Sequence, residues 1–223
     1  MDDMDPIEVR RYGSAGPTVI VLHGGQGRPG SAAGLARALA PDFQVIEPLQ
    51  RRSGRAPLTV SRHVEDLAAI VRGPTVLIGC SWGAMLGLSF AARYPRAVSD
   101  LVLVGCGTYS EGSQLGAAYM RAESYDLIEE EVGPSEAGLP VDEAGHVETW
   151  RDVLRLQREG VEPDAFRAIS ARVLMLHGQV DPHPGAATGD ILCKFIPHLE
   201  YVELSRCGHE PGASVVPGTG SSR

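Results

Sequence analysis

The sequence predicts an α/β fold, in which a mostly parallel sheet is flanked by helices. Strand-length runs of β-branched and aliphatic residues alternate with helix-length segments over much of the 223 residues. Runs such as residues 18–22 are continuously apolar, which is typical of strands buried on both faces. This combination indicates parallel strands joined by helices that cover both faces of the sheet.

Length and composition indicate one domain, and they exclude several classes of protein. With 43% hydrophobic and 22% charged residues, the chain has the composition of a soluble globular protein. No apolar run reaches the roughly 18 residues that a membrane span needs, so no membrane partner is expected. A net charge of −8 argues against nucleic acid as a partner. The acidic N-terminus has no apolar segment after it, which favours a cytoplasmic protein. Oligomeric state cannot be read from the residues.

The order of the elements follows from these runs. An edge strand is expected over residues 7–12, and the first half continues with strands over 18–22, 43–47, 75–78 and 100–104 and helices over 31–40, 61–72 and 84–93. Strands over 172–177 and 199–204 and a helix over 188–196 resume the pattern in the second half.

The alternation fails between residues 107 and 165. This segment has no buried strand run, but it has helical stretches at 114–131 and 149–159. We therefore expect a core of residues 1–106 and 166–211, interrupted by a small helical cap insertion over 107–165. The composition of 212–223 predicts a loose tail.

The most informative stretch is Gly79-Cys-Ser-Trp-Gly83, which lies between a predicted strand and a predicted helix. It fits G-x-S-x-G, the sharp turn that presents a serine as a nucleophile. A β-carbon at position 79 or 83, two residues before or after Ser81, would cause a collision, because strand and helix come close together there. The alternative is an ordinary turn in which Ser81 only caps the helix.

A glycine-rich loop, His23 to Gly30, follows the strand over 18–22. It lacks the lysine of a P-loop and the spacing of G-x-G-x-x-G, so a nucleotide site is disfavoured. It fits the HG-type loop of lipases and esterases, in which the N–H groups of Gly25 and Trp82 would form an oxyanion hole.

A serine needs a base to become nucleophilic, and the base needs an acid to fix its tautomer. An aspartate and a histidine each follow a predicted strand after Ser81, namely Asp181 and His209. Since the loops after parallel strands lie on one edge of a sheet, the three side chains can meet there although they are far apart in sequence.

The chain resembles α/β-hydrolase fold proteins over roughly residues 15–211. The resemblance is carried, in order, by His23-Gly-Gly, Gly79-Cys-Ser-Trp-Gly83, Gly178-Gln-Val-Asp181 and Cys207-Gly-His-Glu-Pro211. The first two motifs are similar to those of small esterases and proline iminopeptidases. The resemblance implies Ser81 as nucleophile, His209 as general base and acid, Asp181 as its orienter, and Gly25 and Trp82 as oxyanion donors.

The chain departs from the family at two points. Members usually end with a helix that packs on the sheet, which the composition of the tail does not predict. The insertion is also shorter than the cap of proline iminopeptidases.

The other candidate ligands have simpler interpretations. His23 is expected to brace the glycine-rich loop, and His63 to lie on a surface helix. His177 and His183 flank Asp181 without a third ligand at zinc-like spacing. No metal or cofactor is therefore expected, and the cysteines are expected to be reduced.

The sequence thus predicts a carboxylesterase-like serine hydrolase that acts on a small-molecule ester or amide. Two alternatives stay open. One is a proline iminopeptidase-like aminopeptidase, for which the acidic run 129–131 is the positive sign. The other is a non-catalytic ligand-binding protein with a degenerate triad.

Overall fold

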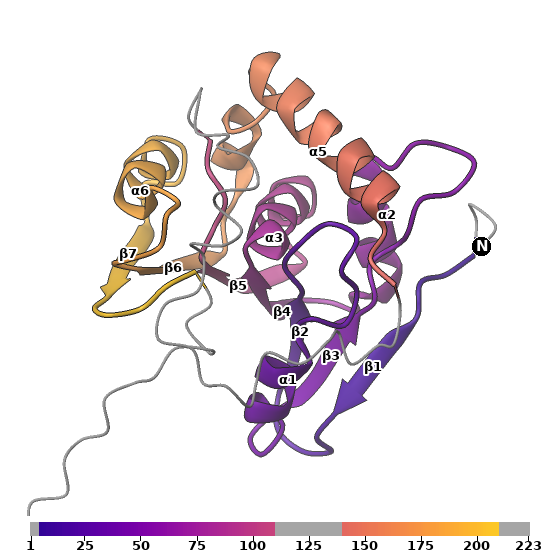
Figure 1. Ribbon diagram of the computed structural model, residues 1–223. Coiled ribbons are helices and arrows are strands. Elements are labelled where there is room, and N and C mark those ends of the chain that lie inside the picture. Colours follow the sequence, from indigo (N-terminus) through magenta and orange to yellow (C-terminus); the bar gives the residue numbers. More distant parts are fainter. Residues whose placement is uncertain (1–4, 110–139, 210–223) are drawn as a thin grey trace, which may run out of the picture.

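The computed structural model describes residues 5–109 and 140–209. Within these residues the strands form one sheet in the order β1-β3-β2-β4-β5-β6-β7 (Figure 1). Its strands are β1 Val9–Tyr12, β2 Thr18–Leu22, β3 Gln44–Pro48, β4 Thr75–Cys80, β5 Val98–Val104, β6 Arg172–Gly178 and β7 Leu199–Leu204. Strand β1 pairs antiparallel with β3 at the edge, and every other pairing is parallel.

The chain changes direction across the sheet at β2. From β2 it moves outward to β3, and it then returns to the other side of β2 to form β4. The crossovers on either side of β2 and β4 therefore diverge, and in open α/β sheets ligands bind beyond the carboxyl ends of the strands at such a point. Leu22 and Gly79 pair at those ends, directly before the two glycine-bearing turns.

Helices cover both faces of the sheet (Figure 1). Because side chains alternate along a strand, Ile20 and Leu22 face the core under α3, whereas Val19 and Val21 face α1. The helices are α1 Ala33–Leu39, α2 Val60–Ile70, α3 Trp82–Arg93, α5 Glu143–Arg158 and α6 Gly185–Cys193, with a 3-10 turn η1 at Asp164–Ala168.

Helix α3 lies at the centre of the larger core. All of its residues from Trp82 to Ala91 are buried, because it packs on β4 and β5 and is itself covered by α2 and η1. The apolar composition that predicted this helix is that of an element buried all round. A helix held in this way gives the turn before it a fixed position.

The predicted strands and helices are confirmed wherever the structure describes them, with shifted boundaries. Helix α5 begins at Glu143, six residues before the predicted start at 149, because the Asp142 carboxylate accepts a hydrogen bond from the Gly145 N–H and caps the first turn. The predicted helix 114–131 and the predicted loose tail 212–223 lie outside the described residues. The division into a core and a cap over 107–165 therefore stays a prediction.

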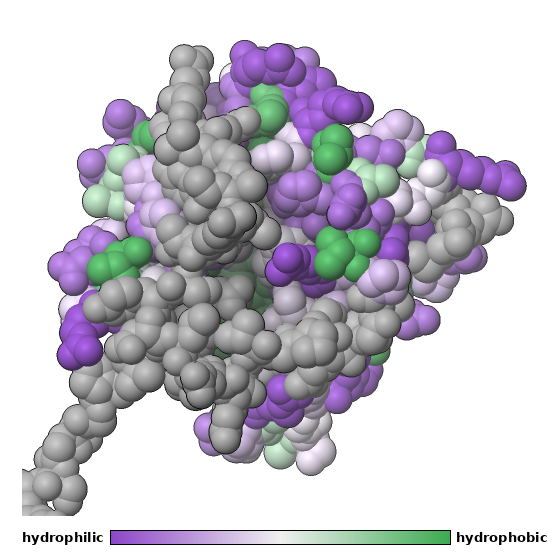
Figure 2. Space-filling model, viewed as in Figure 1, coloured by the Kyte–Doolittle hydropathy of each residue, from purple (hydrophilic) through white to green (hydrophobic). Residues whose placement is uncertain are grey.

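The described surface has no extended apolar patch in the view of Figure 2, where hydrophobic residues occur in separate small groups among hydrophilic ones. The large exposed apolar side chains are isolated valines, such as Val147 on α5 and Val202 on β7. Among the described residues, no helix has both the length and the apolar character that crossing a membrane requires.

A carboxyl group is buried beneath α3. Glu162, which lies between α5 and η1, is 6% exposed, and its Oε1 lies 2.7 Å from the Ser89 hydroxyl. That hydroxyl also lies 3.1 Å from the Met85 carbonyl. The Ser89 hydroxyl is the donor in both contacts, so its one proton is shared between the Glu162 Oε1 and the Met85 carbonyl. Burial raises the pKa of Glu162 to about 7, against the opposing effect of the Ser89 hydrogen bond.

The substitution Glu162→Gln should stabilise the protein increasingly as the pH rises. The unfolded chain loses this proton near pH 4.5 but the folded chain only near pH 7, so the wild-type protein loses stability as the pH rises between these values. The rise in the Glu162 pKa corresponds to a loss of about 3 kcal/mol in the free energy of unfolding, and glutamine removes this loss. Urea unfolding at pH 4.5 and pH 8 measures the free energy of unfolding of both proteins. The exposed control Glu200→Gln should show no such pH-dependent difference, and a Glu162→Gln effect independent of pH would contradict the prediction.

Candidate active site

Ser81 occupies a strained turn between β4 and α3. Its backbone has φ 51° and ψ −115°, a conformation that costs a non-glycine residue on the order of 1–3 kcal/mol. The Ser81 N–H donates to the Val104 carbonyl at 2.8 Å, which ties the turn to the end of β5. Its side chain makes no capping hydrogen bond with α3, so the structure does not favour the interpretation that Ser81 is merely a helix cap.

The two glycines of the turn have steric functions, as the sequence predicts. A β-carbon on Gly79 would collide with the Gly83 carbonyl, and one on Gly83 would collide with the carbonyls of Leu22 and His23. The turn therefore brings β4, α3 and the end of β2 into backbone contact, and Ser81 stands at the point of closest approach.

The glycine-rich loop after β2 lies against this turn. A β-carbon on Gly24 would lie 3.1 Å from the Ser81 β-carbon, and Gly25 has φ 63°, which glycine adopts without strain. The fully buried His23 holds the loop through its Nδ1, 3.0 Å from the Gly24 carbonyl. The expectation that His23 braces the loop agrees with this contact.

The tautomer of His23 follows from its partners. The Gln50 N–H donates to Nε2 at 3.3 Å, so Nε2 is an acceptor and Nδ1 carries the proton that reaches the Gly24 carbonyl. Burial lowers the pKa of His23 to about 4, although the Gly24 hydrogen bond opposes this. A neutral His23 therefore holds the loop at physiological pH.

Gln50, which sequence reasoning missed, links the loop to the residue after the serine. Its Oε1 accepts a hydrogen bond from the Trp82 indole at 2.7 Å, and its Nε2 donates to the His23 carbonyl at 3.1 Å. The segments that carry Gly25 and Trp82 are thus held by one buried side chain. The only signal in the sequence is that Gln50 follows β3, whose carboxyl end lies on the same edge of the sheet.

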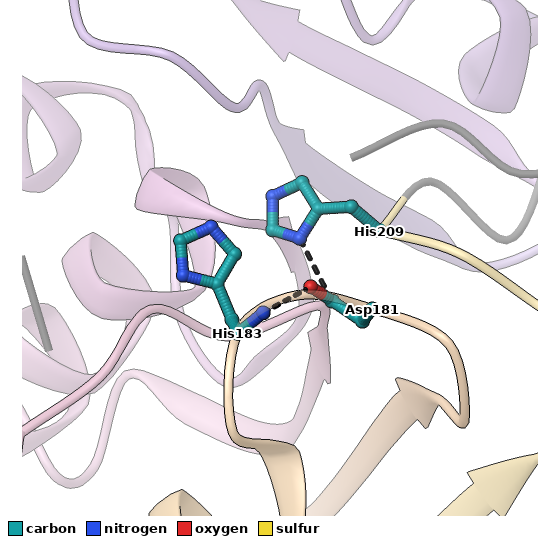
Figure 3. Close-up of side chains that lie close together, drawn as sticks. All are labelled: Asp181, His183 and His209. Atoms are coloured by element: carbon teal, nitrogen blue, oxygen red, sulfur yellow. Dashed lines mark hydrogen bonds and ion pairs between the residues drawn. The ribbon is translucent and has the colours of Figure 1, made fainter. Parts of the chain in front are cut away.

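Asp181 and His209, predicted from separate strands, are hydrogen bonded in the structure (Figure 3). The His209 Nδ1 lies 2.8 Å from the Asp181 Oδ2, and the His183 N–H donates to Oδ1, also at 2.8 Å. Burial alone would raise the pKa of Asp181, but hydrogen bonds from His177 and His209 outweigh it and hold that pKa well below its usual range. Asp181 is therefore ionised and keeps the His209 proton on Nδ1.

The end of β5 brings this pair close to the serine. The Val104 carbonyl accepts the Ser81 N–H, and a β-carbon on the next residue, Gly105, would lie 3.2 Å from the His209 Nδ1. Ser81 and His209 therefore lie on either side of the same short segment. Glycine at 105, with φ 54°, leaves the space that the imidazole occupies.

Asp181, His183 and His209 have potential metal-ligand atoms within 4.8 Å of one another. Figure 3 shows both imidazoles above the carboxylate, with their ring centroids 4.7 Å apart. However, both oxygens of Asp181 already accept hydrogen bonds from N–H groups. This donor set suits a carboxylate that orients an imidazole better than one that binds a cation.

His63 is not where the sequence places it. Expected on a surface helix, it is 4% exposed on α2, with its ring edge-on to Trp82 at 5.7 Å and its Nε2 3.2 Å from the Thr149 hydroxyl. Helix α5 packs on this side of α2, and the residue pattern of α2 alone could not predict that contact. None of the four cysteines, which all lie in the described residues, forms a disulfide.

A separate groove of about 690 Å³ lies at the opposite edge of the sheet, near the amino ends of β2 and β4. Its lining includes Arg11, Thr18, Arg72 and Thr75. None of the predicted site residues borders it, so it is not the candidate site.

Comparison with known proteins identifies relatives. A family model described as "Alpha/beta hydrolase family" matches residues 19–216. The chain is 32% identical over 118 residues to "Lipase LipV" of Mycobacterium tuberculosis, covering 49% of this chain and 45% of the lipase. It is 32% identical over 114 residues to the "Probable proline iminopeptidase" of Streptomyces coelicolor, covering 43% of this chain and 34% of that protein. The chain spans about half, or less, of the length of the curated relatives it matches.

A solved structure shares the fold at low sequence identity. The crystal structure of E-2-(acetamidomethylene)succinate hydrolase superimposes with a TM-score of 0.69 at 22% identity, covering 89% of this chain and 86% of that one. This likeness concerns the fold alone.

The substitution Gly83→Ala should destabilise the protein by about 2 kcal/mol or more, because the new methyl group meets backbone carbonyls that cannot rotate away. Gly34→Ala on α1 is the matched control. Its β-carbon meets nothing within 4 Å, so alanine should stabilise the helix by up to about 1 kcal/mol. Thermal unfolding measures both, and equal melting temperatures for Gly83→Ala and wild type would contradict the collision.

Proposed function

Because the chain belongs to the alpha/beta hydrolase family, we propose that it is a serine hydrolase of small carboxylic esters, with Ser81, His209 and Asp181 as its catalytic triad. The observation that carries the proposal is the 2.8 Å hydrogen bond from His209 to the buried Asp181, beside a serine held at positive φ. Nucleophilic catalysis by a serine requires an imidazole oriented in this way by a carboxylate.

In this mechanism the Ser81 hydroxyl attacks the ester carbonyl while the His209 Nε2 takes its proton. Asp181 holds the Nδ1 proton of His209 and stabilises the imidazolium that forms. His209 then protonates the leaving alcohol as the tetrahedral intermediate collapses to an acyl-enzyme. A water molecule, deprotonated by His209, releases the acid and regenerates Ser81.

The negative charge of the tetrahedral intermediate needs donors fixed in advance. We assign them to the N–H groups of Gly25 and Trp82. Trp82 is the first residue of α3, where N–H groups have no partner within the helix and the dipole favours negative charge. The Gln50 hydrogen bonds to Trp82 and to the His23 carbonyl support this assignment, since they restrain both segments.

The proposed substrate is a small carboxylic ester. The family hosts several reactions on one fold, so the fold does not identify the substrate. Similarity to a lipase favours esters, whereas similarity to a probable proline iminopeptidase keeps an N-terminal proline amide as the alternative. The acidic run 129–131, which suggested a cationic substrate, lies outside the described residues.

The substitution Ser81→Ala should lower turnover of p-nitrophenyl acetate at least about a thousandfold, because loss of the nucleophile removes the acyl-enzyme route. It should also abolish covalent labelling by a fluorophosphonate probe, which reacts with activated serines. The exposed Ser61→Ala on α2 is the matched control and should keep full labelling. Labelling of Ser81→Ala would contradict the assignment of the nucleophile, and absence of labelling in well-folded wild type would favour the non-catalytic binding protein.

A substrate panel separates the two enzymatic candidates. We expect kcat/KM for p-nitrophenyl acetate and butyrate to exceed that for proline p-nitroanilide by at least about tenfold, which corresponds to about 1.4 kcal/mol of differential transition-state binding. The opposite order would support the aminopeptidase, provided that Ser81→Ala abolishes that activity as well.

A further inference from the structure

The strand that leads to Asp181 carries a second imidazole in contact with its carboxylate. We infer that His177 is a positioning residue for the proposed triad: it holds the Asp181 carboxylate in place and, by donating to the same oxygen as His209, shares the negative charge that stabilises the His209 imidazolium. This inference rests on the proposed roles of Asp181 and His209. The contact between His177 and Asp181, on which the inference is based, is present whether or not the protein is an enzyme.

Three nitrogen atoms lie within hydrogen-bonding distance of the Asp181 carboxylate. The His177 Nε2 lies 2.9 Å from Oδ2, the oxygen that also accepts from the His209 Nδ1 at 2.8 Å. The His183 N–H donates to Oδ1. The His177 Nε2 also lies 3.2 Å from the His183 carbonyl, so His177 ties both the carboxylate and the loop that carries it to the end of β6.

The His177 ring cannot turn away from this contact. The residue is 1% exposed, and a β-carbon on Gly185, the first residue of α6, would collide with the ring. The helix backbone therefore packs directly on the imidazole. A larger residue at 185 would displace the ring from Asp181, which explains the glycine at the start of a helix, where it is otherwise unfavourable.

The tautomer of His177 follows from the same geometry. Because Asp181 is ionised and only accepts, the proton of a neutral His177 must lie on Nε2. The Nδ1 atom is buried and has no hydrogen-bond partner among residues 5–109 and 140–209. A buried nitrogen without a partner is unfavourable, because it has lost its hydrogen bonds to water. The ring orientation that places Nε2 beside the carboxylate therefore leaves Nδ1 without a hydrogen bond to any described residue.

The chemical consequence is a division of charge. A hydrogen bond to the ionised form of a carboxylate lowers its basicity, and the same oxygen then stabilises a neighbouring imidazolium less strongly. His177 consequently keeps the His209 pKa lower than a carboxylate paired with His209 alone would. A general base with a lower pKa is unprotonated over a wider pH range, which is the state that can accept the Ser81 proton.

Other titratable groups also face this cluster. The His183 ring lies 4.7 Å from the His209 ring, between centroids, and Tyr201 on β7 interacts electrostatically with Asp181. Glu210, the next residue after His209, lies outside the described residues. These groups are unchanged when only His177 is replaced, so a difference between His177 variants reports on His177.

The test is the His209 pKa, measured by ¹⁵N NMR of the imidazoles in the full chain. The substitution His177→Met fills the space without a donor, and we expect it to raise the His209 pKa by about 0.5 or more. In His177→Gln the amide nitrogen is the same number of bonds from the backbone as Nε2, so this variant should restore the wild-type value. His146→Gln, an exposed histidine on α5, is the control and should change nothing. An unchanged or lowered His209 pKa in His177→Met would overturn the inference.

A measurement on the wild-type protein covers the case in which His177→Met does not fold. The ¹⁵N shifts of His177 at pH 8 should show a proton on Nε2 and none on Nδ1. A proton on Nδ1 instead would overturn the inference, since such a ring cannot donate to Asp181.

Activity provides a separate readout. If Ser81 and His209 act as proposed, the acidic limb of the kcat/KM profile should move to higher pH in His177→Met by the same amount as the NMR value, with KM little changed. An NMR shift in a protein that the fluorophosphonate probe does not label would sink the proposed function and leave the positioning inference standing. Labelling of Ser81 without a change in the His209 pKa would support the proposed function and overturn the positioning inference.

Discussion

The arrangement of the whole carboxyl edge depends on one close approach, between the turn at Ser81 and the end of β2. Gly79 and Gly83 allow backbone atoms of β4, α3 and β2 to meet where any β-carbon would collide. The approach holds Ser81 in a conformation that a non-glycine residue adopts at a cost. Burial of α3 on all sides offsets that cost, since the helix cannot move away without exposing the largest part of the core. The strain at the serine is thus sustained by packing of residues distant from it.

Buried ionisable groups around α3 take different charge states, and in each case the partners decide which. Asp181 is ionised because hydrogen bonds from His177 and His209 and from the His183 N–H outweigh the effect of its burial. His23 is neutral because it is fully buried and its Nε2 accepts a backbone hydrogen bond. Glu162 holds its proton to about pH 7 because burial outweighs the hydrogen bond from the Ser89 hydroxyl. Burial penalises the charge in every case, and only a sufficient number of donors reverses that penalty.

Much of the fold could be predicted because its signals are local. A parallel strand buried on both faces is a run of apolar residues, and β2 and β6 begin where such runs begin, whereas β7 begins where its alternating pattern begins. The positions of Asp181 and His209 at one edge also followed, since parallel strands share their carboxyl edge. The contacts of Gln50 and His177 could not be predicted. Neither forms a motif, and each acts through a partner that other strands bring to it. The surface position expected for His63 was wrong for a similar reason, because α5 covers it from another part of the chain.

By itself, the sequence determined the order of strands and helices, the glycine turn at Ser81 and the chain order of the candidate triad. These features depend on residue type and spacing within short segments, and such segments have few allowed backbone conformations. Only the tertiary structure decided which oxygen of Asp181 each imidazole contacts, which tautomer His23 and His177 adopt, and that one side chain, Gln50, links the two loops beside Ser81. The reason is that hydrogen bonds are directional over a few tenths of an ångström. These positions are fixed only when elements from distant parts of the chain pack together, and no residue pattern along the chain predicts them.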